Sequence, residues 1–155
     1  MHNPLNIALS SVLLIAVVGG SFFYVSNGGP VELPPKPWIG ITEGLFVNPA
    51  AAEALGLSQQ HGLLIYTITP ASPADKAGLR GASNVTIIEG RQIPIGGDIV
   101  VNMDDKQIDT PEDVCTVLAQ KKVGDNISFL IDRNGVVQRV DLILEELPLE
   151  ARTLC

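Results

Sequence analysis

The first strong feature in the pattern of apolar and polar positions is a stretch from Leu5 to Val25 that is mostly apolar and carries no charge. As a helix it would be about 31 Å long, which matches the roughly 30 Å hydrocarbon core of a bilayer. Phe22, Phe23 and Tyr24 would then lie at one end, at the interface that aromatic side chains favour. The pattern predicts an N-terminal transmembrane helix within residues 1–25.

A cleaved signal peptide is the alternative interpretation of the same stretch. The residues before it include no Lys or Arg, and it exceeds the roughly 7–15 apolar residues of a signal peptide, so an uncleaved anchor is favoured. The small residues Gly19, Gly20 and Ser21 keep cleavage open. The nearest basic residue is Lys36, so charge does not fix the orientation in the membrane. Residues 26–37 are rich in Gly and Pro and predict an extended spacer.

Short apolar strands alternate with short capped helices in the rest of the chain. Strand patterns cover residues 38–42, 62–69, 85–88, 92–95, 98–103, 126–133 and 136–144. A capping residue followed by Pro predicts helices that begin after Asn48, Ser72 and Thr110. Asn134-Gly135 predicts a tight hairpin between the last two strands. The sum predicts an α+β domain, a short-stranded antiparallel sandwich or barrel with two to three short helices.

Composition excludes several classes of function. The net charge is −7, and binding to nucleic acid needs clustered Lys and Arg. Cys115 and Cys155 are far apart and have no metal-type spacing, so the sequence predicts neither a metal site nor a disulfide framework. Cys115 is expected to be a small buried side chain and Cys155 to lie on a mobile tail, although an oxidising compartment would allow a bridge between them.

No catalytic constellation is evident in the sequence. A serine hydrolase needs a nucleophile, a base and an orienting acid held together. His2 precedes the apolar stretch, His61 lies in a polar turn, and the acidic cluster near Asp104, Asp105 and Asp109 lacks the spacing of a calcium loop. We therefore predict no enzyme, no cofactor, no metal and no small-molecule substrate.

Four motifs follow one another in a fixed order between residues 38 and 147. They are Trp38-Ile39-Gly40-Ile41, the segment Ser72-Pro73-Ala74-Asp75-Lys76-Ala77-Gly78-Leu79, Gly97-Asp98-Ile99-Val100, and Gly124-Asp125 with Asp132-Arg133-Asn134-Gly135. Together they resemble the PDZ domain of HtrA- and Deg-type serine proteases. The chain departs from the family pattern by inserting the hairpin at 85–95, and by Asp104-Asp105 where a turn is usually Asp-Gly. No counterpart of the protease domain is expected.

The resemblance implies a groove that binds a peptide by strand addition. The edge would be residues 39–42, the opposite wall the helix from Pro111, and a terminal carboxylate would bind backbone N–H groups of the loop. The implied site residues are Trp38, Ile39, Gly40, Ile41, Thr42, Pro111, Cys115 and Leu118. The alternative is an ordinary first strand with a packing glycine, and Cys115 and Leu118 as plain core residues.

The expected organisation is an anchor at 1–25, a linker at 26–37, a PDZ domain at 38–147 and a tail at 148–155. The leading hypothesis is a single-pass membrane protein with an extracytoplasmic PDZ domain. It would capture protein C-termini or extended segments in protein quality control, with a separate protease as a further partner. A structural component of a membrane complex and a remnant of a protease are the alternatives. The tail that ends Thr153-Leu154-Cys155 could also dock in the groove; otherwise it is a disordered end.

Overall fold

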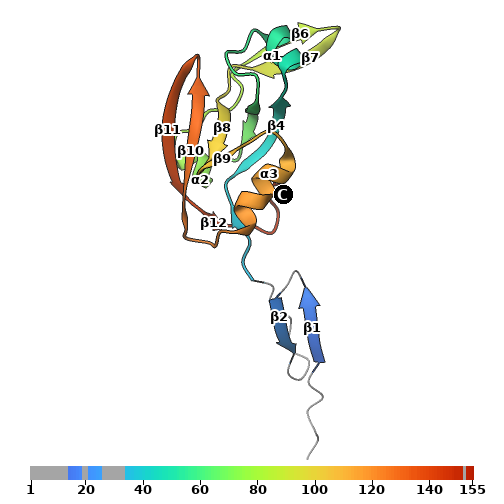
Figure 1. Ribbon diagram of the computed structural model, residues 1–155, viewed down its shortest axis with the longest axis vertical. Coiled ribbons are helices and arrows are strands. Elements are labelled where there is room, and N and C mark those ends of the chain that lie inside the picture. The colour runs from blue at the N-terminus through green and yellow to red at the C-terminus, as the bar shows by residue number, and fades with distance from the viewer. Residues whose placement is uncertain (1–13, 19–20, 26–33, 152) are drawn as a thin grey trace, which may run out of the picture. The chain divides into compact units, whose positions relative to one another are not determined.

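The computed structural model describes residues 14–18, 21–25, 34–151 and 153–155, and Figure 1 shows the course of the chain. The chain divides into two units, Met1–Pro34 and Pro35–Cys155. In the first unit, β1 (Leu14–Val18) and β2 (Ser21–Val25) pair as antiparallel strands. Each unit is described separately below.

The helix that was predicted for the leader is wrong for the two stretches described there, because both are strands. Branched and aromatic residues such as Ile15, Val17, Phe22 and Phe23 have high strand propensity, which a count of apolar residues ignores. The remainder of the leader lies outside the described residues, as does most of the linker, at 26–33. Within the described part of the chain, no helix has both the length and the apolar character needed to cross a membrane.

The second unit is built on one antiparallel sheet with the strand order β11-β10-β8-β5-β4, in which β9 pairs with β8. Its strands are β4 (Ile41–Val47), β5 (Gly62–Ile68), β8 (Ile99–Met103), β9 (Lys106–Gln107), β10 (Asn126–Arg133) and β11 (Val136–Ile143). Two strands, β4 and β11, therefore lie at the edges. The predicted hairpin at Asn134-Gly135 is confirmed by the pairing of Arg133 with Val136.

Three short helices accompany the sheet: α1 (Pro49–Leu55), α2 (Pro73–Lys76) and α3 (Pro111–Ala119). Each begins at the predicted capping residue, whose side chain accepts a hydrogen bond from a backbone N–H in the first turn. Local capping chemistry of this kind acts within four residues. This locality explains why the sequence predicted all three helix starts.

Two small sheets complete the unit. In one, β3 (Pro37–Trp38) pairs with β12 (Glu145–Glu146). In the other, β6 (Asn84–Ile88) pairs with β7 (Arg91–Ile95), which confirms the predicted hairpin. The strand expected at 38–42 is therefore interrupted. Ile39 and Gly40 lie between β3 and β4 and form a loop.

The main core lies between the sheet and α3. Phe129, Ile131 and Ile65 from the sheet are fully buried there. Val114 and Val117 of α3 pack into the same cluster. Burial of these positions fixes α3 against the sheet.

One buried ion pair ties the sheet together at the start of β8. Asp98 is 1% exposed, and it accepts hydrogen bonds from Arg133 Nε and Nη2, each 2.7 Å long. The backbone N–H of Arg80 donates a third, at 2.8 Å. Arg133 also donates to the carbonyl oxygen of Gly78. The pair thus joins β10 to the segments on either side of the hairpin at β6 and β7.

Replacing Arg133 by Ala is expected to lower the free energy of unfolding by about 3 kcal/mol, because Asp98 is left buried without its counter-charge. Arg139→Ala is the matched control, since its pair with Asp141 is largely exposed and should contribute under about 1 kcal/mol. Urea denaturation measures both. Equal effects of the two substitutions would contradict the role given to Asp98.

Candidate functional site

The outer edge of β4 is the candidate site. Within the part of the chain that the structure describes, β4 has one strand partner, β5. The other side of β4 therefore presents backbone groups that can pair with another chain. The loop before it, Ile39-Gly40, leads from β3 into this edge.

The loop uses its carbonyl oxygens but not its N–H groups. The N–H of Ala74 donates to the carbonyl oxygen of Ile39, and the N–H of Thr69 donates to that of Gly40, both at 2.8 Å. Ile39 and Gly40 are buried, yet no hydrogen bond among the described residues begins at either N–H. Buried backbone donors are nearly always paired. Two adjacent free donors can bind an anion or a carbonyl oxygen.

Gly40 is required for a reason that the sequence did not show. Its φ is +91°, and a Cβ atom built there would lie 2.1 Å from both Cβ and Oγ of Ser72. In this structure the contact that needs the glycine is with Ser72, the fully buried N-cap of α2, which positions the loop.

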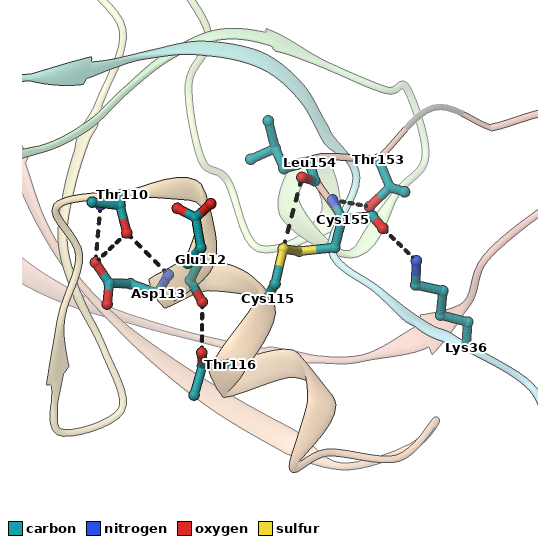
Figure 2. Close-up of a disulfide and its surroundings, with 9 residues drawn as sticks. All are labelled: Lys36, Thr110, Glu112, Asp113, Cys115, Thr116, Thr153, Leu154 and Cys155. Atoms are coloured by element: carbon teal, nitrogen blue, oxygen red, sulfur yellow. Dashed lines mark hydrogen bonds between the residues drawn. A yellow bond between two sulfur atoms is a disulfide. The ribbon is translucent and has the colours of Figure 1, made fainter. Parts of the chain in front are cut away.

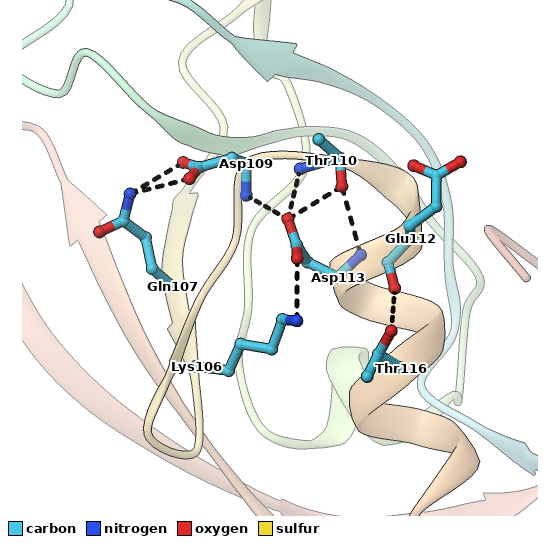
Figure 3. A network of polar contacts seen from close by, with 7 residues as sticks. All are labelled: Lys106, Gln107, Asp109, Thr110, Glu112, Asp113 and Thr116. Carbon is cyan, nitrogen blue, oxygen red and sulfur yellow. Dashed lines mark hydrogen bonds and ion pairs between the residues drawn. The ribbon is translucent and has the colours of Figure 1, made fainter.

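The helix α3 packs into the same core cluster as Ile39 and Ile41. A polar network holds its first turn (Figure 3). Thr110 and Asp113 form a capping box, and Lys106 Nζ lies 3.0 Å from Asp113 Oδ1. The hydrogen bond from Lys106, then those from the Thr110 hydroxyl and the backbone N–H of Asp109, hold the pKa of Asp113 well below its ordinary value. Asp113 therefore stays ionised and continues to cap α3 into acid.

A disulfide joins Cys115 of α3 to Cys155, with the two Cα atoms 5.5 Å apart. The prediction of an unbridged Cys115 and a mobile Cys155 is therefore wrong. Two cysteines separated by 40 residues carry no pairing signal by themselves, because only the fold brings them together. Figure 2 shows the tail beside α3, where Lys36 Nζ donates to the main-chain oxygen of Cys155 at 2.6 Å.

The structure divides the predicted site residues into two groups. Four side chains are buried in the core: Trp38, Ile39, Ile41 and Leu118. The other side chains are accessible: Thr42 and Cys115 are half-buried and Pro111 is exposed. The loop thus offers its backbone rather than its side chains. Sequence reasoning missed Lys36, which contacts Cys155, whereas Leu154 and Cys155 belong to the tail for which docking in the groove was considered.

The residues considered for catalysis do not assemble into a site. His61 Nδ1 lies 3.8 Å from Asp109 Oδ1, and both side chains are substantially exposed. Asp104 accepts a hydrogen bond from the N–H of Ser128 and pairs with Lys121 at 2.7 Å, so it anchors a turn. Among the described residues, no group of three or more His, Cys, Asp or Glu could hold a metal ion.

Comparison with known proteins shows which family this chain resembles. A family model described as PDZ domain matches residues 43–144. Protease Do-like 1, chloroplastic, of Arabidopsis thaliana is 28% identical over 137 residues, covering 88% of this chain and 28% of that protein. A probable periplasmic serine endoprotease, DegP-like, of a Marinomonas species is 27% identical over 113 residues, covering 73% of this chain and 21% of that protein. The chain thus spans about a quarter of the length of these relatives.

Solved structures show the same fold. One is described as HtrA-type protease AlgW with decapeptide. It has a TM-score of 0.55 and 22% identity, over 74% of this chain and 30% of that chain. The same protease with tripeptide has a TM-score of 0.53 and 23% identity, over 74% of this chain and 33% of that chain.

Gly40→Ala is expected to destabilise the chain strongly, because the new Cβ meets Ser72 in addition to the strain of a positive φ. Gly124→Ala is the matched control, since its φ is also +91° but no atom lies within 4 Å of its built Cβ. The control should lose only about 1–2 kcal/mol from backbone strain. Thermal denaturation compares them, and a loss at Gly40 no larger than at Gly124 would contradict the packing role.

Asp113→Asn is expected to lower the melting temperature near neutral pH. The depressed pKa means that the ionised carboxylate stabilises the fold fully above its unfolded-state pKa of about 3.9. This stabilisation is lost as the pH falls through the lower folded-state pKa. Melting curves between neutral and strongly acid pH should therefore show the two proteins converging in acid. A constant difference across that range would refute the electrostatic origin.

Proposed function

The chain belongs to the PDZ domain family, and we propose from this premise that it binds extended peptides by strand addition to β4. The peptide would lie between β4 and α3, antiparallel to β4, and its terminal carboxylate would accept hydrogen bonds from the free N–H groups of Ile39 and Gly40. The observation that carries the proposal is this pair of buried, unpaired donors beside an edge strand without an outer partner. A peptide would pair with the two N–H groups and with the edge of β4 at once.

Similar solved structures support a peptide as the ligand. The protease AlgW was solved with a decapeptide and with a tripeptide. That protease shares the fold of this chain, so we expect an extended ligand to bind here at the outer edge of β4.

Accessible positions of α3 point to the preferred side chains. Cys115 is half-buried and lies one helical turn before the buried Leu118. Leu118 belongs to the core, so the accessible apolar group on this wall is Cys115, which favours a hydrophobic side chain at or near the end of the peptide. We expect dissociation constants in the micromolar range, about 8 kcal/mol of binding free energy.

We further propose that the domain acts outside the cytoplasm, as an adaptor that presents captured chains to a separate protease. The Cys115–Cys155 bridge supports this placement, because disulfides persist in oxidising compartments. The relation to HtrA-type proteases supports the link to protein quality control. The attachment of the domain to a membrane rests on the apolar composition of the leader alone.

Peptide binding is tested by fluorescence polarisation with the whole chain in detergent, with and without a reductant. A peptide with an apolar C-terminal residue should bind with micromolar affinity. Its C-terminal amide should bind at least about tenfold more weakly, because one charge-assisted hydrogen bond contributes about 1.5–3 kcal/mol. Equal binding of the acid and the amide would contradict the carboxylate site, and would favour recognition of a folded partner in a membrane complex.

N-methylation of the peptide backbone provides the matched control for strand addition. Alternate N–H groups of an added strand face the sheet edge. Methylation of one that faces β4 should abolish binding, while methylation of its neighbour should leave the affinity unchanged. Equal tolerance at both positions would contradict pairing with β4.

A further inference from the structure

The end of the chain lies against the walls of the proposed groove. Leu154 and Cys155 are half-buried and pack against the main core cluster. The disulfide fixes Cys155 to Cys115, in the middle of α3. In addition, the main-chain oxygen of Leu154 lies 3.8 Å from Cys115 Sγ, within reach of a weak sulfur contact.

A second contact ties the same segment to the residue that precedes β3. Lys36 Nζ donates to the main-chain oxygen of Cys155 at 2.6 Å. Lys36 immediately precedes β3, and only Pro37 and Trp38 separate it from the loop Ile39-Gly40. Figure 2 shows Leu154 and Cys155 between α3 and the chain that leads from Lys36 toward β4. The segment thus lies between α3 and the chain that leads into the loop before β4.

We propose that the segment Thr153–Cys155 is a covalently tethered plug of the peptide-binding groove, and that reduction of the Cys115–Cys155 disulfide releases it. This inference rests on the proposed function and names its regulation. An added strand lies about 4.8 Å from the strand it pairs with. The side chain of Cys155, bonded to the helix on the far side of that space, occupies room that the ligand needs.

The plug covers the groove without imitating a ligand. No hydrogen bond among the described residues joins the tail to the N–H groups of Ile39 and Gly40, or pairs it with β4. A peptide would therefore make contacts that the tail does not make. It is the covalent bond that keeps the tail in place, because tethering gives it a high effective concentration at the groove. Once the bond is broken, the exposed Lys36 contributes little, and the half-buried Leu154 is the main contact that remains.

The release step is a thiol–disulfide exchange with an external dithiol. One thiolate of the reductant attacks a sulfur of the Cys115–Cys155 bond, forms a mixed disulfide and displaces the other sulfur as a thiolate. The second thiol of the reductant then resolves the mixed disulfide. Cys115 and Cys155 end as two thiols, each with one added hydrogen, and the dithiol ends as a disulfide, so two electrons are transferred.

The test measures peptide affinity by fluorescence polarisation for the oxidised chain, the chain reduced with dithiothreitol, and Cys155→Ser. The reduced chain and Cys155→Ser should bind an apolar-ended peptide at least about tenfold more tightly than the oxidised chain. Dithiothreitol should leave the affinity of Cys155→Ser unchanged, which controls for effects of the reductant elsewhere. Circular dichroism checks that each form is folded, and the reduced wild-type chain serves if the variant does not fold.

Three results would overturn the plug. Equal affinity in the oxidised and reduced chains would refute it while leaving the proposed function intact. Tighter binding by the oxidised chain would mean that the bridge builds the groove rather than closes it. Binding by no form would refute the proposed function and the plug together.

An independent readout is alkylation of Cys115 in Cys155→Ser by a maleimide. Saturating peptide should slow it, and an unchanged rate would show that ligand and tail use different sites.

Discussion

The contact between Gly40 and Ser72 is the constraint on which the candidate site depends. Ser72 caps α2 and fills the volume that any side chain at residue 40 would need. The loop can approach α2 only with glycine there, and the approach lets Ala74 donate to the carbonyl oxygen of Ile39. With both loop carbonyls turned toward the domain, the two N–H groups are left for a ligand. The packing requirement at Gly40 thus underlies the peptide binding that we propose.

The second wall of the groove is held by independent means. The capping box of α3 and the contact between Lys106 and Asp113 fix its first turn, and burial of Val114 and Val117 fixes its face. The disulfide from Cys115 closes a loop of about 40 residues. In the chain-entropy account such a closure stabilises the fold by about 4 kcal/mol. The same bond that stabilises the domain therefore also determines what lies in the groove.

Local chemistry explains what the sequence could predict. The caps at Asn48, Ser72 and Thr110 and the turn at Asn134-Gly135 act over a few residues, so their elements were predicted nearly to the residue. The motifs that resemble a PDZ domain extended this to the fold class. Features that depend on distant partners were missed. They include the pairing of β3 with β12 and the disulfide, because neither leaves a pattern in the nearby sequence.

The site shows the same division between local and distant information. The loop Ile39-Gly40 and the helix α3 were identified by resemblance. The requirement for glycine at residue 40 comes from Ser72, which lies 32 positions away. The side chains of Trp38 and Ile41 are buried in the core, so these two residue types are needed for the fold. The proposed contacts with a ligand are made by the backbone. In the leader, apolar content predicted a helix, but the described stretches are strands, in line with the strand propensity of their residues.

Amide hydrogen exchange, measured with and without a bound peptide, tests strand addition at β4 most directly. The account predicts that the peptide slows exchange at the N–H groups of Ile39 and Gly40 and along the outer edge of β4, while the opposite edge, β11, is unaffected. Slowed exchange at β11, or unchanged exchange at Ile39 and Gly40 in the presence of a saturating peptide, would contradict it.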